Sequence, residues 1–227
     1  MPLYYTKQNL YREIDQLRLY IGLPENKFPI LIRDHIEHRP GLKIEDVPFS
    51  TPGLRGISAF GKGGQCDVVL LNSHRSSAEK NFDCAHEAVH LGLHRNEQKD
   101  SFTCFDDVTN KQDSFLEWHA NEGGAELIVP HRDFIPRFLQ ELQYVRDNPD
   151  LFYDVRAKLA DFYHVSYTVI ENRINNLGYE IDQYANGIDM DSLQILSRKQ
   201  QYDLGITSTA YNSVCDCLPF ELFDIIG

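Results

Sequence analysis

The sequence has no run of about 18 consecutive apolar residues, so we expect no transmembrane helix. Residues 1–20 lack the basic segment and apolar core of a secretory signal peptide. The five cysteines are an odd number, which without a secretion signal argues against a disulfide framework. These absences predict a protein of the reducing cytoplasm.

Clusters of basic residues are also missing. No run of five or more Lys or Arg occurs, and the net charge is -12. Nucleic-acid phosphates repel such a chain unless its basic residues gather on one face. We therefore expect no direct binding of nucleic acid, and we interpret the acidity as a source of solubility. The oligomeric state is not indicated by the sequence.

The hydrophobic pattern predicts a mainly helical chain with a small sheet. Helical spacing marks residues 4–21, 30–38, 77–94, 113–128, 131–145, 150–163, 167–177 and 190–202. Strand-like segments cover 41–49, 54–61 and 66–72, and a Gly-Gly between the last two favours a hairpin. Residues 95–112 are polar and aperiodic, and are interpreted as a long loop. The predicted fold class is α+β, with a mixed or antiparallel sheet of about three strands and a helical C-terminal region.

The helix at 77–94 carries the motif His-Glu-x-x-His at 86–90. Residues four apart lie almost above one another on a helix, so His86 and His90 can bind one zinc ion. Glu87 lies beside them, where it can act as a general base toward water. On a helical wheel Asp83 and His94 share the sector of these three residues, and the remaining positions are apolar. The pattern predicts a core helix with one buried polar stripe, which needs a partner such as a metal.

A third ligand must come from elsewhere, because a straight helix cannot surround an ion with three ligands. This argument removes His94. The segment EWHANEGGAELIVP offers four candidates, namely Glu117, His119, Glu122 and Glu126. The wheel places Glu117 on a face with Asn121 and Gly124, and we interpret the opposite, acidic face as solvated. We therefore expect Glu117 to be the third ligand. Asn121 is predicted to accept a hydrogen bond from a ligand histidine.

Together, NFDCAHEAVHLGLH, EWHANEGGAELIVP and LADFYHVSYTVIENRINNLG resemble the ImmA/IrrE family of metallopeptidases over residues 40–179. The resemblance implies a small zincin-like (gluzincin-type) fold with a zinc ion on His86, His90 and Glu117 and with Glu87 catalytic. We expect a core with an N-terminal helix at 1–130, a helix-turn-helix-like region packed on it at 131–179, and an extension at 180–227. Gly123-Gly124 departs from the family pattern and puts the straightness of its helix in doubt.

The predicted function is that of a zinc-dependent endopeptidase acting on a specific intracellular protein. The resemblance implies that this substrate is a helix-turn-helix transcriptional repressor, as for family members beside mobile elements or stress-response genes. An extended peptide could pair with strand 66–72 if that strand lies at the sheet edge. Three residues are candidates for an additional oxyanion donor, namely Tyr153, Tyr163 and His164.

Three other interpretations stay open. The chain could be a zinc-containing regulatory protein without proteolytic activity, of anti-repressor or toxin–antitoxin type, although an intact Glu87 argues against this. It could bind DNA through residues 167–177, although Arg173 is the only basic residue there. Finally, Cys215 or Cys217 could donate a thiolate to the zinc and inactivate the enzyme. Cys84 falls on the apolar side of the helix and is excluded as a ligand.

Overall fold

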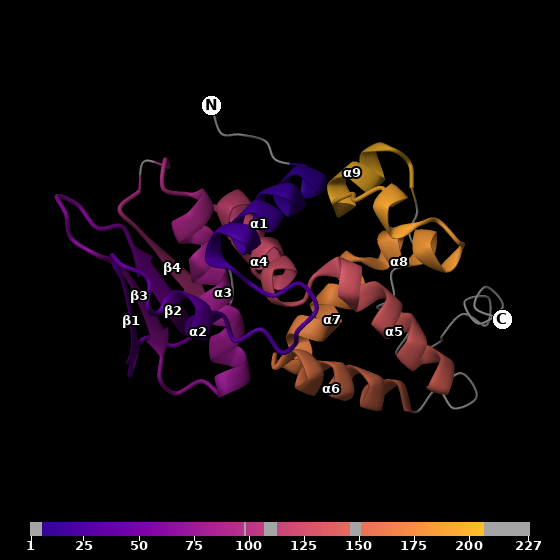
Figure 1. The fold of residues 1–227 in the computed structure, drawn as a ribbon, viewed down its shortest axis with the longest axis horizontal. Helices are drawn as coiled ribbons and strands as arrows, with labels where there is room; N and C mark the ends of the chain where they lie inside the picture. Colours follow the sequence, from indigo (N-terminus) through magenta and orange to yellow (C-terminus); the bar gives the residue numbers. More distant parts are fainter. Residues whose placement is uncertain (1–5, 98, 107–112, 146–150, 207–227) are drawn as a thin grey trace. The chain divides into compact units, whose positions relative to one another are not determined.

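The computed structural model describes residues 6–97, 99–106, 113–145 and 151–206 (Figure 1). Its chain divides into two compact units. The sheet unit comprises Tyr11–Ile128 and Tyr163–Ser166, and the helical unit comprises Met1–Leu10, Val129–Phe162 and Tyr167–Gly227. Each is described by itself, and helix α1 (Lys7–Ile21) contributes to both.

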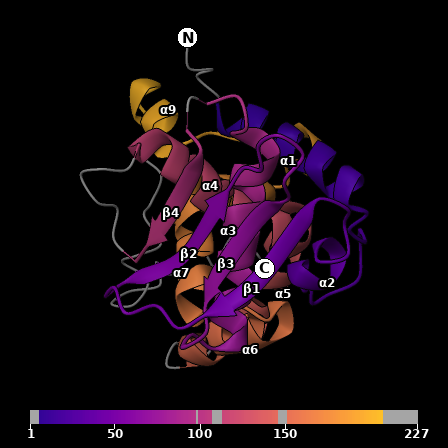
Figure 2. The ribbon, with the colours of Figure 1, turned by 90° about the vertical axis from the view of Figure 1, so that its left-hand side faces the viewer.

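The sheet unit contains four strands in the order β1-β3-β2-β4 (Figure 2). They are β1 (Leu42–Val47), β2 (Leu54–Ala59), β3 (Asp67–Asn72) and β4 (Ser101–Phe105). Strands β1 and β3 are parallel, whereas β2 is antiparallel to both β3 and β4. The α+β class and the β2–β3 hairpin are thereby confirmed.

Strand β4 corrects the prediction of a loop across 95–112. Its side chains alternate, with Phe102 and Cys104 buried and Ser101 and Thr103 exposed. The segment is too short for this alternation to stand out among polar neighbours, and it becomes a strand because β2 supplies its hydrogen-bonding partners. Because β4 and β1 end the strand order, they are the edges of this sheet and β3 is internal.

Helix α3 (Ser77–Leu93) packs on the sheet and against α4 (Ser114–Ile128). It begins with a capping box, in which Ser76 and Glu79 each bond the other's backbone N–H. The short helix α2 (Ile32–Ile36) also packs on α3, and the Asn81 amide bonds the backbone at Ile30 and Ile32. Helix α3 therefore lies at the centre of the sheet unit, which explains its apolar composition.

The helical unit contains α5 (His131–Val145), α6 (Phe152–Tyr163), α7 (Tyr167–Asn176), α8 (Gly178–Ala185) and α9 (Arg198–Asp203). Lys7 ties the start of α1 into it, since Lys7 Nζ lies 2.9 Å from Glu180 Oε1 and both side chains are buried. Of the described helices, none is both long and apolar enough to cross a bilayer.

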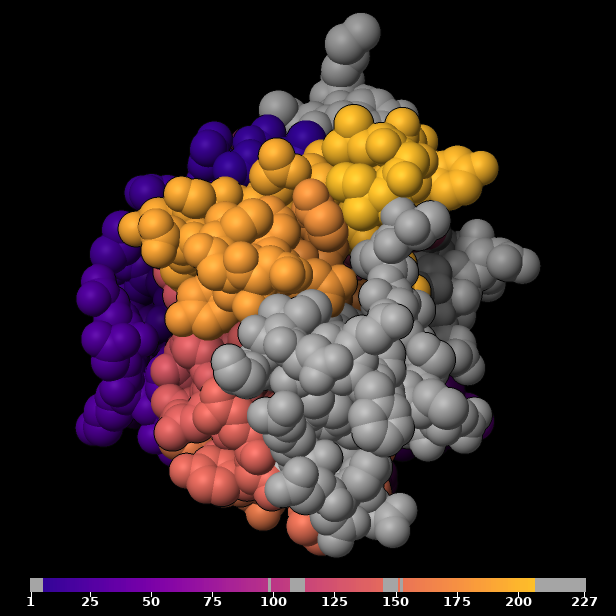
Figure 3. All heavy atoms as spheres, turned by 90° about the vertical axis from the view of Figure 1, so that its right-hand side faces the viewer, coloured from indigo at the N-terminus to yellow at the C-terminus, as the bar shows by residue number. Residues whose placement is uncertain are grey.

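The end of the helical unit differs from the sequence prediction in two ways. Gly178 begins α8 instead of ending a helix. The helix expected at 190–202 is interrupted, because only a 3-10 turn (Met190–Ser192) precedes α9. Gln183 holds the intervening chain by bonding both the N–H and the C=O of Gln194. Figure 3 shows this segment beside α8 at the surface.

Candidate metal centre

The polar stripe predicted on α3 is buried along its whole length. Asp83, His86, Glu87, His90 and His94 are each at most 2% exposed. An unsatisfied buried polar group costs free energy, so each member of such a stripe needs a partner. Asp83 has two, because its carboxylate lies 2.9 Å from Arg55 Nε and 2.6 Å from Arg75 Nε. Glu87 lies against Gly56 of β2, whereas His86, His90 and His94 lie on the side of α3 that meets α4.

Three side chains there present atoms suited to a metal ion. His86 Nε2 lies 3.1 Å from His90 Nε2, and Glu117 oxygens lie 3.5 Å from His86 Nε2 and 3.8 Å from His90 Nε2. Tetrahedral zinc with bonds of about 2.0–2.1 Å separates its ligand atoms by about 3.3 Å. The spacing and the two-imidazole, one-carboxylate donor set therefore fit zinc. The structure brings together the three residues that the sequence predicted as ligands.

The outer nitrogens of both histidines are hydrogen-bonded. His86 Nδ1 lies 3.0 Å from Asn121 Oδ1, the amide oxygen that the sequence predicted as its partner. Because an amide oxygen only accepts, Nδ1 carries the proton and the Nε2 lone pair faces Glu117. Burial tends to lower the pKa of His86, but Cys104 and Glu117 raise it well above its usual value. In the metal-free protein a proton therefore competes with a cation for His86.

His90 is oriented by a chain of two further histidines. His90 Nδ1 lies 2.8 Å from His94 Nδ1, and His94 Nε2 lies 2.8 Å from His119 Nδ1. Burial lowers the pKa of His94 to about 3 and that of His119 to about 4, so both rings are neutral at physiological pH. If His90 binds a metal through Nε2, its Nδ1–H donates to His94 Nδ1, and the Nε2–H of His94 donates in turn to His119 Nδ1. His94 therefore hydrogen-bonds the candidate ligand His90 and does not belong to the group of three candidate ligands.

Glu87 is the most unusual group in the centre. Its side chain is fully buried, and a hydrogen bond from Ser58 only partly offsets the cost of burying its charge. Burial raises the pKa of Glu87 to about 7. Gly56 lies directly over the carboxylate, because a Cβ added there would lie 2.8 Å from Glu87 Oε1. A carboxylate whose pKa is close to neutrality can both accept and release a proton at physiological pH.

A β-bulge in β2 lies next to the point where Gly56 approaches Glu87. The register between β2 and β4 shifts between Leu54 and Gly56, so Arg55 is the extra residue of the bulge and has no pairing partner on β4. Arg55 turns toward Asp83, which lies one helical turn before Glu87. Burial raises the pKa of Asp83, and Arg55 and Arg75 oppose that shift. The bulge thus pairs Asp83 with a cation and places Gly56 over Glu87.

Gly124 sets the separation of α3 and α4. A Cβ at this position would lie 3.0 Å from the backbone nitrogen and 3.2 Å from the Cα of His86. Despite its two glycines, α4 is one continuous helix (Ser114–Ile128). The two glycines therefore do not break the helix, and Gly124 lets its backbone approach that of α3 closely.

We expect Gly124→Ala to destabilise the protein by about 1–3 kcal/mol, since the His86 backbone cannot yield as a side chain can. The same shift moves Glu117 relative to His86 and weakens zinc binding. Gly123→Ala is the matched control, because its Cβ would meet mainly the side-chain tips of Ile14 and Val89. Urea unfolding and chelator competition measure the two effects. Equal stability and zinc affinity in the two variants would contradict the spacing argument.

The opposite face of α4 corrects the sequence analysis, because His119, Glu122 and Glu126 are buried instead of solvated. Helix α1 lies against Glu122, since Tyr11 Oη donates to Glu122 Oε1 at 2.5 Å, whereas His119 stacks on His94. Arg18 donates to the Leu127 carbonyl and interacts electrostatically with Glu126. A helical wheel cannot reveal this, since it shows which residues share a face but not what covers them.

The three oxyanion candidates lie in different settings. Tyr163 is buried with its ring edge-on to Phe28, at 5.3 Å between centroids. The His164 carbonyl accepts a hydrogen bond from Asn81 Nδ2. Tyr153, in the helical unit, is 60% exposed and stacks on Tyr167. An oxyanion role for any of them stays a prediction. Cys215 and Cys217 lie outside the described residues.

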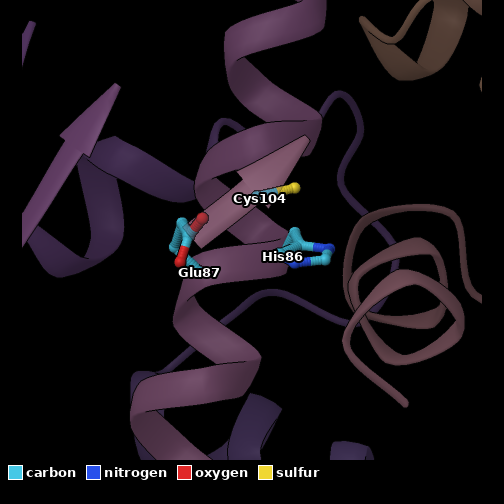
Figure 4. A group of neighbouring side chains, drawn as sticks. All are labelled: His86, Glu87 and Cys104. Atoms are coloured by element: carbon cyan, nitrogen blue, oxygen red, sulfur yellow. The ribbon is translucent and has the colours of Figure 1, made fainter. Parts of the chain in front are cut away.

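Sequence analysis missed the contribution of β4 to the centre. The Phe102 ring stacks on His90, with centroids 4.1 Å apart. Cys104, His86 and Glu87 each offer a potential ligand atom, and these three atoms lie within 4.8 Å of one another (Figure 4). Alternation in the segment Ser-Phe-Thr-Cys-Phe was the available signal.

An α+β fold in which a His-Glu-x-x-His helix faces a glutamate on a second helix defines a metallopeptidase-type protein. The model of the M78 peptidase family, described as the IrrE N-terminal-like domain, matches residues 40–175. The chain belongs to this family, as the resemblance to ImmA/IrrE proteins implied. The search of curated proteins found no significant match.

Proposed function

We propose that this chain is a zinc-dependent endopeptidase that cleaves a specific intracellular protein. His86, His90 and Glu117 would hold the zinc, and Glu87 would be the catalytic base. The observation that carries the proposal is the Glu87 carboxylate, which is fully buried beside His86, one of the three proposed ligands. A purely structural metal site does not need such a group, so Glu87 also argues against a zinc-containing regulator without proteolytic activity.

The proposed mechanism divides the work among these residues. When bound, zinc supplies a Lewis acid that polarises the peptide carbonyl and makes water more acidic. Glu87 accepts a proton from the attacking water and delivers it to the leaving amine nitrogen. Asn121 and His94 hold the imidazoles of His86 and His90 in a fixed orientation. Gly56 lies against the Glu87 carboxylate, and the Phe102 ring stacks on His90.

An extended substrate would pair with the edge strand β4. The earlier suggestion of strand 66–72 is wrong, because β3 lies between β1 and β2 and has no free edge. Strand β4 has β2 on one side and carries Phe102 and Cys104 against the candidate ligands. A peptide that pairs with β4 would therefore lie beside the zinc site, with its backbone held by main-chain hydrogen bonds.

The substrate class rests on family resemblance, and we propose a helix-turn-helix transcriptional repressor. A protein partner is favoured over DNA, because the one basic residue of α7, Arg173, is 1% exposed and donates from Nε to the Val129 carbonyl. With a net charge of -12, the chain would need an exposed basic face to bind phosphates.

The test is incubation of the full chain with repressors encoded beside its gene, followed by mass spectrometry. We expect one repressor to be cut at one site, with cleavage lost to a chelator and restored by added zinc. Cleavage that survives the chelator would contradict a metal-dependent mechanism. If no repressor is cut but an unrelated protein is, the substrate assignment fails and the peptidase assignment stands. A gel-shift assay across salt concentrations tests the DNA alternative.

A further inference from the structure

The sheet has a second edge, strand β1, on the side away from β4 (Figure 2). Strand β1 has β3 on one side and, among the described strands, none on the other. The carbonyls of Gly41 and Val47 accept hydrogen bonds from the β3 side of the sheet. Because main-chain groups alternate in direction along a strand, the N–H and C=O of Ile44 and Asp46 point away from β3. The outer side of β1 therefore offers main-chain donors and acceptors to another strand.

The side chains of β1 alternate between the two faces of the sheet. Asp46 lies on the face covered by helices, where its carboxylate oxygens lie 2.9 Å from Arg33 Nη1 of α2 and 2.8 Å from Lys80 Nζ of α3. Lys43 and Glu45 lie on the opposite face, with side chains 63% and 49% exposed. Lys43 Nζ is 2.6 Å from Glu45 Oε1. The edge strand thus exposes one positive and one negative side chain, two residues apart.

These two charges select one way in which β1 can pair with β1 of a second copy. Two copies related by a two-fold axis bring the same surface together, with their strands antiparallel. If the axis passes through Ile44, Lys43 of each copy faces Glu45 of the other. Moving the axis by one residue keeps the main-chain pattern but sets Lys43 opposite Lys43 or Glu45 opposite Glu45. Like charges directly opposite one another are destabilising, so only the register centred on Ile44 is self-complementary.

The same register also satisfies the outer main chain of β1. The N–H and C=O of Ile44 would exchange hydrogen bonds with those of Ile44 in the second copy. On either side of the axis, the Asp46 N–H would donate to the Leu42 carbonyl of the other copy. The Leu42 N–H is already used, because it donates to the Arg39 carbonyl. The two Ile44 side chains, each half-buried in its own copy, would meet at the axis.

We propose that β1 is the interface of a symmetric dimer, in which β1 of a second copy pairs with it and joins the two four-stranded sheets into one. An exposed edge strand is a template for pairing with another chain. A second copy is favoured over an unrelated peptide, because the charges of β1 complement its own sequence in one register. The other edge, β4, stays available to substrate. The inference therefore does not rest on the proposed function.

Sedimentation equilibrium of the full chain tests the dimer over a concentration series from about 1 μM to 1 mM. A reducing agent is present, because Cys66 is an exposed free cysteine that could otherwise cross-link two copies. We expect the wild type to form a reversible dimer. Lys43→Glu and Glu45→Lys should each raise the dimer dissociation constant by about tenfold or more, because each sets like charges opposite one another twice.

Lys158→Glu is the matched control for these charge variants. The Lys158 side chain is also 63% exposed, and its Nζ lies 2.7 Å from Glu141 Oε2 in the helical unit. The substitution therefore makes the same change of charge at a lysine of the same exposure and breaks an ion pair in the same way. Because Lys158 does not belong to β1, the dimer dissociation constant should be unchanged.

An equimolar mixture of Lys43→Glu and Glu45→Lys is the most discriminating sample. Opposite charges again face each other when one variant pairs with the other, so dimers should return at wild-type concentrations. The ion pair between residues 43 and 45 of one chain is lost in both variants and is not restored by mixing. General repulsion does not predict this pattern, since the net charge of -12 becomes more negative in one variant and less negative in the other.

The outcomes separate the dimer from the proposed function. A wild-type chain that stays monomeric throughout the series overturns the dimer, and if the charge variants also lose substrate cleavage, the edge binds a substrate segment instead. A dimer that both charge variants retain with an unchanged dissociation constant overturns β1 as its interface. Failure of the mixture to dimerise overturns the register. A chain that lacks zinc binding or cleavage but shows the predicted pattern contradicts only the proposed function.

Discussion

Glu87→Gln should lower the rate of substrate cleavage by about 10²–10⁴-fold, because an amide cannot take a proton from the attacking water. Zinc binding should be unchanged, since Glu87 is not among the proposed ligands. Glutamine has almost the same size as glutamate, so the close contact with Gly56 is preserved. Single-turnover cleavage assays with zinc-saturated protein measure the effect, and chelator competition measures the zinc affinity.

Glu122→Gln is the matched control for this variant. Glu122 is also a buried glutamate of the sheet unit, but it bonds Tyr11 on the face of α4 away from Glu117. A glutamine there can still accept that hydrogen bond, so cleavage should stay within a few-fold of the wild-type rate. Full activity in Glu87→Gln, or an equal loss in both variants, would contradict the assigned role of Glu87.

The same Glu87→Gln substitution should stabilise the metal-free protein at neutral and alkaline pH. Burial raises the pKa of Glu87 from 4.5 to about 7, so the folded state holds a proton that the unfolded state has already released. Stability is therefore lost as the pH rises from the unfolded to the folded pKa. The loss is less than about 1 kcal/mol at pH 5 and about 3 kcal/mol at pH 8. Glutamine removes this dependence.

Urea unfolding with a chelator present, at pH 5 and pH 8, measures the difference between wild type and Glu87→Gln. The comparison between the two pH values cancels the constant cost of burying an amide. A stability difference that does not change with pH would show that the Glu87 carboxylate titrates normally. Combined with the expected loss of activity, the predicted gain would mean that the proposed catalytic carboxylate is held at the expense of stability.

The central helix was predictable because two constraints coincide in it. Residues 77–94 have a nearly continuous apolar surface, and the capping box at Ser76 starts the helix, so that both features act within the helix itself. Its polar stripe could only be buried against other elements, which is the position it occupies. Gly124 was equally informative, because a missing side chain in a helix marks a close backbone approach.

The parts that could not be predicted depend on distant partners. Strand β4 exists because β2 supplies its hydrogen bonds, and its position decides that Cys104 and Phe102 reach the histidines. The burial of Glu122 depends on α1, which lies about a hundred residues earlier in the sequence, and that of His119 on the histidine of another helix, His94. Periodicity describes one element at a time, so it cannot show such contacts.

The central claim is that His86, His90 and Glu117 form one zinc site, and Glu117 is its most discriminating member. The most direct test is the zinc dissociation constant of Glu117→Ala, measured by chelator competition against wild type and Glu122→Gln. We predict one zinc per wild-type chain, an unchanged constant for Glu122→Gln, and a constant at least about 100-fold higher for Glu117→Ala. Wild-type affinity in Glu117→Ala would contradict the site.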